Sequence, residues 1–386
     1  MSLVEDPPDA TSAPPPPSDD DAAAAMRRRE RLEGAVVTAG SSIAAVLIAL
    51  ALSALLLVIT GKNPGDVVST MAEVATTSRF QFETIQRATP FIIAAVAFAI
   101  ASKMNLFNIG VEGQYLFGMF WAAVAGAYVN LPAVLHVGFI LVVGMAAGAF
   151  WAGIAGYLKV RLGVSEIIST IMLNAIALQI TDWLFNDYFR FDDGSGSLDV
   201  RTKPLPSTAW MPDWFDGRLN SFIVIALIVA AGYWVLVNKT RFGFRLRASG
   251  LNPIAASTSG ISSNRMVLTA MLISGAIAGL AGLQYLLGEA QSYGPARPSG
   301  YGFNGLSVAL LGRNHPVGIV LAALLWGFLE SAAGPLQLDD IPRSIVNVIQ
   351  GITLLSVVIV NEVVKRWYTR RTTERAAARL GEGGAA

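Results

Sequence analysis

Ten apolar segments dominate this chain, and a sequence with so many of them cannot fold as an ordinary soluble domain. A helix needs about 20 mostly apolar residues to cross a bilayer, and most of these segments approach or exceed that length. Charged residues make up only 14% of the chain, whereas soluble domains carry about 25%. We therefore predict an all-α, polytopic integral membrane protein with about ten transmembrane helices. The segments are residues 35–59, 88–102, 110–129, 133–158, 166–185, 220–238, 265–287, 300–311, 316–333 and 342–363.

The remaining composition narrows the possible functions. The formal net charge is +1, so no basic excess points to a nucleic-acid partner. Cysteine is absent, which excludes disulfides and thiolate ligands, and the only two histidines are His136 and His315. We accordingly expect no metal site in this chain.

Charge distribution predicts the topology and the domain boundaries. Residues 1–33 are Pro-rich and acidic and then basic, and we expect this stretch to be disordered and cytoplasmic. With both termini inside, most of the 28 basic residues lie on the cytoplasmic side, as the positive-inside rule requires. The membrane domain is then 34–366, with an outer loop at 186–219 and an inner loop at 239–264. Residues 367–386 form a basic cytoplasmic tail.

The first motif, at 103–114, joins the short segment 88–102 to the next span. It contains Phe107, Asn108, Glu112 and Gln114 among two glycines. Irregular backbone and a carboxylate are tolerated at membrane depth only inside protein or beside a cavity, so these residues could border a transport path. The alternative is an ordinary interfacial turn with Glu112 in water.

The second motif brackets the other short segment, 300–311, and contains Tyr301, Phe303 and Asn304. Phe-Asn-Gly at 303–305 weakly repeats Phe-Asn-Ile-Gly at 107–110, and the two predicted spans run in opposite senses, as in an inverted repeat. Flat rings beside amides suit a neutral, planar or polyhydroxylated solute better than an ion, which would require rings of charge. The alternative is that the rings pack helices and the amides cap them.

The third motif, in the inner loop, predicts a short capped helix. Asn252 suits the N-cap, Pro253 the first helical position and Gly260 the C-terminal cap. Two turns are not stable alone, so this helix must dock either on a partner or on its own spans. The residues available for such a contact include the small apolar Ile254, Ala255 and Ala256.

Together, the stretches 105–114, 245–261 and 300–316 resemble the permease subunits of ATP-binding-cassette importers. The branch resembled includes ribose, branched-chain amino acid and, nearest, nucleoside permeases, and the resemblance covers residues 35–366. It implies a second permease subunit, identical or a sister, and an extracytoplasmic substrate-binding protein. It also implies partner ATPase subunits, which hold ATP and Mg²⁺ and receive the helix at Asn252–Ser259 as a coupling element.

No Gly-x-x-x-x-Gly-Lys-Ser/Thr phosphate loop occurs in the sequence, so we expect a transport subunit that is not itself an enzyme and binds no cofactor. The expected location is a prokaryotic cell membrane and the expected cargo a nucleoside. Ribose or another simple sugar is the alternative cargo. Further alternatives are an ion-coupled transporter using Glu112 or Glu330, and an enzyme acting on lipid-linked sugar, for which the sequence offers no catalytic cluster.

Overall fold

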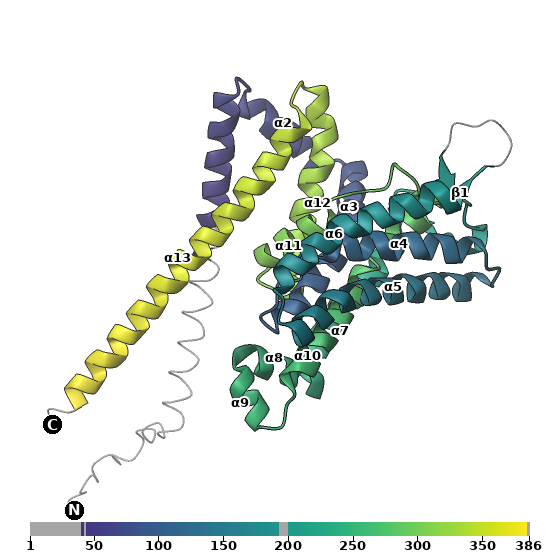
Figure 1. The fold of residues 1–386 in the computed structure, drawn as a ribbon. Coiled ribbons are helices and arrows are strands. Elements are labelled where there is room, and N and C mark those ends of the chain that lie inside the picture. The colour runs from purple at the N-terminus through teal and green to yellow at the C-terminus, as the bar shows by residue number, and fades with distance from the viewer. Residues whose placement is uncertain (1–39, 42–43, 193–199, 384–386) are drawn as a thin grey trace, which may run out of the picture. The chain divides into compact units, whose positions relative to one another are not determined.

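The computed structural model describes residues 40–41, 44–192 and 200–383 and is almost entirely helical there. The chain divides into two compact units, one made of residues 1–52 with 355–386 and the other of Ser53–Leu354. The larger unit contains the elements α2 to α12 (Figure 1). Its helices are α2 (Pro64–Thr76), α3 (Ser78–Ser102), α4 (Val111–Ala127), α5 (Ala133–Leu162), α6 (Glu166–Leu184), η1 (Phe185–Phe189), η2 (Ser207–Ala209), α7 (Phe222–Lys239), α8 (Arg241–Leu251), α9 (Pro253–Thr258), α10 (Ser263–Ala278), η3 (Tyr285–Ala290), α11 (Tyr301–Leu311) and α12 (Pro316–Leu338).

Two helices cross the boundary between the units. The first is the apolar helix Ala44–Ile59, and the second is α13, which extends from Arg343 to Gly383. Residues 367–383 of the predicted basic tail therefore continue α13 as helix. The predicted disordered segment 1–33 lies outside the described residues.

Six of the described helices are long and apolar enough to cross a membrane, and three shorter apolar helices accompany them. The long ones are Ser78–Ser102, Ala133–Leu162, Glu166–Phe189, Phe222–Lys239, Pro316–Leu338 and Arg343–Val364, and the short ones are Ala44–Ile59, Ser263–Ala278 and Tyr301–Leu311. The prediction of a multi-span, all-α protein is confirmed. The number ten stays a prediction.

Three details of the predicted helices need correction. The segment 88–102 is not a short helix but the buried C-terminal part of the 25-residue α3. The first turns of α3 are polar, so a search for apolar segments did not include them. The predicted span 265–287 is interrupted, because α10 ends at Ala278 and the chain turns at Gly279 before η3. The inner loop contains a helix, α8, that its Gly243 and Gly250 concealed.

The core of the larger unit lies around α3. Every residue from Ala88 to Ala101 is buried, and α7, α10, α11 and α12 pack around this stretch. Many of its side chains are alanines, which let neighbouring backbones approach closely, as is typical of helix packing in lipid. Beside this core, α4, α5 and α6 lie next to one another (Figure 1).

A glycine crossing joins α5 to α10. Gly144 and Gly148 on α5 face Gly275 and Gly279. A Cβ at Gly148, Gly275 or Gly279 would overlap the opposite segment, and one at Gly144 would lie 3.1 Å from Gly279 O. Within lipid there is little hydrophobic gain from bringing two helices together, so this backbone approach supplies the van der Waals contact that holds them.

The predicted outer loop is folded rather than a simple connector. Strand β1 (Arg190–Phe191) pairs antiparallel with β2 (Arg201–Thr202), and β3 (Asp213–Trp214) with β4 (Leu219–Asn220). Thr202 N donates to Tyr293 O (2.8 Å) and Leu205 N to Gln291 O (2.8 Å), which fixes the loop to the segment after η3. His136 adds a further bond, to Thr208 Oγ1 (2.8 Å), and is therefore a structural residue.

Candidate functional site

The first motif forms a turn between α3 and α4 that is held by buried amides. Asn108 and Gln114 exchange two hydrogen bonds of 2.9 Å, and Asn108 Nδ2 also donates to Ser274 Oγ (2.8 Å) on α10. Asn108 Oδ1 accepts from Gly110 N (3.1 Å). Both side chains are 1% exposed, and neither lines the two cavities described below. Their hydrogen-bonding groups are thus engaged in holding the turn.

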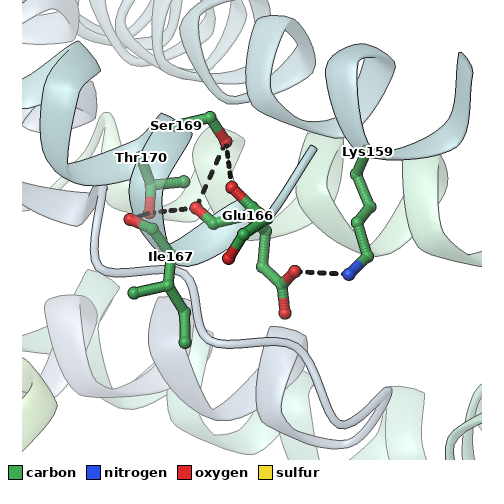
Figure 2. Close-up of polar contacts among 6 residues, drawn as sticks. Lys159, Glu166, Ile167, Ser169 and Thr170 are labelled. Atoms are coloured by element: carbon green, nitrogen blue, oxygen red, sulfur yellow. Dashed lines mark hydrogen bonds and ion pairs between the residues drawn. The ribbon is translucent and has the colours of Figure 1, made fainter. Parts of the chain in front are cut away.

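Helix α6 fastens the same turn from the other side. Asn174 Oδ1 accepts from Gly113 N (2.8 Å), and Asn174 Nδ2 donates to Ile109 O (3.0 Å). At the start of α6, Glu166 pairs with Lys159 Nζ at 2.6 Å. Figure 2 shows Lys159 reaching from α5 to the Glu166 carboxylate, beside the hydroxyls of Ser169 and Thr170 that bond back to the first turn.

The Phe107 side chain, unlike the amides, remains partly accessible. It is 43% exposed, and its ring meets the edge of Phe98 with centroids 5.8 Å apart. Among the predicted path residues of the first motif, Phe107 is therefore the one with an exposed side chain.

Glu112 brings the first and second motifs together. Its carboxylate accepts hydrogen bonds from Gly300 N (2.6 Å), Gly302 N (2.8 Å) and the Tyr115 hydroxyl (3.0 Å). A carboxylate at the start of a helix satisfies backbone N–H groups that have no partner within the helix and interacts favourably with the helix dipole. Gly302 lies so close to the Glu112 backbone that no Cβ fits there. The side chain is 8% exposed, so the interpretation of Glu112 as a solvated residue in a turn is wrong.

Two cavities adjoin this junction, and four of the predicted path residues line them, whereas Phe107, Asn108 and Gln114 line neither. Tyr301 and Asn304 line a cavity of about 690 Å³, while Glu112 and Phe303 line a second one of about 400 Å³. The segment 297–299 contributes to both. Tyr301 also packs edge-on against Phe91, with ring centroids 5.6 Å apart.

Apart from Glu330, which the sequence had offered as an ion-coupling carboxylate, the polar and aromatic residues that α12 and α13 give to the larger cavity were missed by sequence reasoning. Trp326 and Glu330 come from α12, and Arg343, Asn347 and Gln350 come from α13. The last three follow an i, i+4, i+7 spacing inside an apolar segment, which places them on one helix face. This spacing is the sequence signal by which Arg343, Asn347 and Gln350 could have been identified as one polar face.

The third motif folds as predicted. Helix α9 begins at Pro253, and Asn252 Oδ1 accepts from Ile254 N (3.1 Å) and Ala255 N (3.0 Å). Gly260 has φ +78°, and the backbone returns through a 3.0 Å bond from Ile261 N to Ala256 O. The helix, its N-cap and its C-terminal glycine are confirmed.

All of α9 except Ala256 is exposed and free to contact a partner. Ile254 is 77% exposed and Ala255 is also exposed, whereas Ala256 is 4% exposed and faces the protein. Ala256 thus belongs to the inner side of the helix, and the exposed apolar surface continues into Leu251 (88% exposed) and Phe244 (63%) on α8.

The inner loop packs directly on the first motif. Leu246 of α8 is fully buried in a cluster with Met104 and Leu106, and Gly250 lies against the backbone of Lys103. Burial, together with the nearby Arg247 guanidinium, lowers the pKa of Lys103. A displacement of α8 and α9 would therefore reach the turn at 103–110 through direct contact.

Known proteins resemble this chain over most of its length. The guanosine ABC transporter permease protein NupP of Bacillus subtilis is 36% identical over 319 residues, covering 81% of this chain and 91% of that protein. The nucleoside ABC transporter permease protein NupB of Lactococcus lactis is also 36% identical, over 72% of this chain and 78% of that one. The glucose ABC transporter permease protein TsgB13 of Haloferax volcanii is 32% identical, over 85% and 89%.

The family model for the branched-chain amino acid transport system permease component matches residues 81–358, which include all three motifs and both cavities. This match and the curated relatives agree with the many apolar helices of the structure. The chain therefore belongs to the family of branched-chain amino acid transport system permease components.

Proposed function

We propose that this chain is the membrane subunit of an ATP-driven importer that carries nucleosides into the cytoplasm. The observation that carries the proposal is the 36% identity to permeases named for guanosine and for nucleosides, over up to 91% of the relative's length. The cavity between α3, α11, α12 and α13 supports it, because it combines aromatic walls with amide groups.

A simple sugar is the second candidate cargo. The relative named for glucose is only slightly less similar, at 32% identity, and covers more of this chain than NupP does. Sugars and nucleosides share a polyhydroxylated part, so amides and carboxylates serve both, and only the nucleobase distinguishes them.

Uptake measurements separate these cargoes. Cells with and without this chain should be given radiolabelled guanosine and uridine, before and after ATP depletion, with excess ribose or glucose as competitors. We expect ATP-dependent nucleoside uptake that is lost on deletion and resists both sugars. If deletion leaves nucleoside uptake unchanged and abolishes ATP-dependent sugar uptake, the cargo is a simple sugar and the nucleoside proposal is wrong.

An ion-coupled mechanism fits the carboxylates poorly. Glu112 is occupied by two backbone N–H groups and a hydroxyl, and Glu330 by Arg343 at 2.7 Å and by Gln350 at 3.2 Å. A carboxylate that exchanges protons or Na⁺ must release its partners during each cycle. Energy from an ATPase outside this chain, where ATP and Mg²⁺ would bind, requires no such change.

The exposed surface of α8 and α9 is the proposed ATPase contact. Phe244, Leu251 and Ile254 are apolar and largely exposed, and α8 also carries three arginines. A movement of the ATPase would pass through α8 to the turn at 103–110 and, through Glu112, to the start of α11.

Ile254→Asp should uncouple ATP hydrolysis from transport, because it places a charge on the exposed tip of α9 without disturbing the buried Ala256. In proteoliposomes with the cognate ATPase and binding protein, we expect cargo-stimulated hydrolysis to fall at least about tenfold, which corresponds to about 1.4 kcal/mol. Leu338→Asp is the matched control, because Leu338 is 88% exposed at the end of α12 and lies outside the inner loop. Normal coupling in the Ile254 variant would contradict the assignment.

The remaining partners follow from the same proposal. Helices α5 and α6 carry large apolar residues that are exposed on the surface of this chain. Such a surface suits contact with lipid and with a second permease subunit, identical or a sister. The exposed apolar residues include Leu135, Val142, Phe150, Ile168 and Met172. An extracytoplasmic binding protein would deliver the cargo, and both termini would lie in the cytoplasm of a prokaryotic cell.

A further inference from the structure

The 690 Å³ cavity has the size of a small-molecule site, since ligand pockets typically measure roughly 300–1,000 Å³. Its walls come from α3, the segment 297–300, α11, α12 and the start of α13, all within the larger unit. The rings of Phe91, Tyr301 and Trp326 line it, and Tyr301 offers most of the accessible ring surface, because Phe91 is 3% and Trp326 is 2% exposed. Such rings favour a planar solute that can stack or meet them edge to face.

The charges around the cavity are compensated. Arg343 pairs with Glu330 at 2.7 Å, Arg87 with Glu83 at 2.7 Å and Arg297 with Asp182 at 2.6 Å. An anionic cargo would require guanidinium groups without carboxylate partners, and a cationic cargo would require the reverse. The cavity therefore suits a neutral solute.

Polar groups of this lining come from α12 and α13, among other elements. Glu330 and Gln350 are hydrogen-bonded to each other across α12 and α13, with Asn347 on the same face of α13. Carboxylate and amide oxygens are common partners of ribose hydroxyls.

We propose that this cavity is a nucleoside-binding site of the permease itself, in which the Tyr301 ring contacts the base and the Glu330–Gln350 pair with Asn347 contacts the ribose. The assignment rests on the proposed nucleoside import and adds the site and the role of each wall. The predicted path residues Asn108 and Gln114 are replaced in this role by residues of α12 and α13.

Photolabelling locates the site directly. The assembled transporter, embedded in nanodiscs without binding protein, should be irradiated with 8-azidoguanosine and digested. We expect the label on peptides containing residues 297–307 and 343–354, and we expect excess guanosine but not glucose to prevent it. Guanosine-protected labelling only at other peptides would overturn the assignment.

A variant series tests the residues proposed to contact the base and the ribose. Tyr301→Leu removes the ring and should weaken guanosine binding to the same nanodiscs about tenfold. Tyr157→Leu is the matched control, because Tyr157 is 56% exposed on α5 and lies outside the cavity lining. Asn347→Ala changes an exposed residue and should fold normally, so it provides a second test. It should reduce the preference for guanosine over 2′-deoxyguanosine.

Two failures are distinguishable. If wild-type transporter imports guanosine and both variants bind it as wild type does, the site assignment fails while the proposed function stands. If wild-type transporter imports glucose and no nucleoside, the proposed function fails and this site assignment fails with it.

Discussion

Glu112→Ala should lower the free energy of unfolding by about 2 kcal/mol or more, because each buried group that loses its partner costs about 1–3 kcal/mol. Two such groups depend on this carboxylate, Gly300 N and Gly302 N, whereas the Tyr115 hydroxyl keeps Pro298 O as a second partner at 3.0 Å. The start of α11 would no longer be fixed to α4. Tyr301, which lines the larger cavity, would then no longer be held in place. The measurement is the melting temperature of the detergent-purified permease, together with its yield in membranes.

Two further variants bracket this result. Glu112→Gln keeps one acceptor oxygen and should fall between wild type and Glu112→Ala. Glu83→Ala removes a carboxylate whose pair with Arg87 is partly exposed, and such pairs contribute less than about 1 kcal/mol. A Glu112→Ala protein that melts like wild type but no longer transports would show that this carboxylate acts in the transport cycle rather than in fastening α11.

Gly279→Ala should be the most disruptive methyl addition among the helix crossings. The new Cβ would overlap the backbone carbonyl of Gly144, and a backbone atom in a packed helix cannot rotate away as a side chain can. Overpacking of this kind costs about 1–3 kcal/mol and sometimes more. Since α5 and α10 meet through four glycines, we expect a strong loss of folded protein by size-exclusion chromatography.

Matched glycine controls come from the same larger unit. Gly138 on α5 and Gly232 on α7 have no atom within 4 Å of a built Cβ. Alanine at either position should leave the fold intact and add up to about 1 kcal/mol of helix propensity. If Gly279→Ala behaves like these two, the close approach of α5 and α10 is not required for folding.

Some features of this protein were predictable because they depend on residues close together in sequence. The caps of α9 are an example, since Asn252, Pro253 and Gly260 act on backbone groups only two or three positions away. The predicted helix and its boundaries followed from that local chemistry. The adjacent α8 was missed, because its two glycines serve close packing against α7 and the turn at Lys103 rather than ending the helix.

The role of the polar residues in the first two motifs could not be read from sequence in the same way. Asn108, Gln114 and Asn304 all carry a side-chain amide. Asn108 and Gln114 form hydrogen bonds with each other inside the protein, whereas Asn304 lines a cavity. An amide can bond either to the protein or to a solute. Which of these occurs depends on what the fold brings within about 3 Å of it.

The sequence by itself determined that this is a multi-span helical membrane protein with a short capped helix in an inner loop. Apolar run length and capping are properties of continuous stretches, so no tertiary contact was needed to find them. Only the tertiary structure decided that Glu112 joins α4 to α11, and that Phe91, Trp326 and Gln350 share one cavity. These residues are far apart along the chain, and only the packing of α11, α12 and α13 against α3 brings them together.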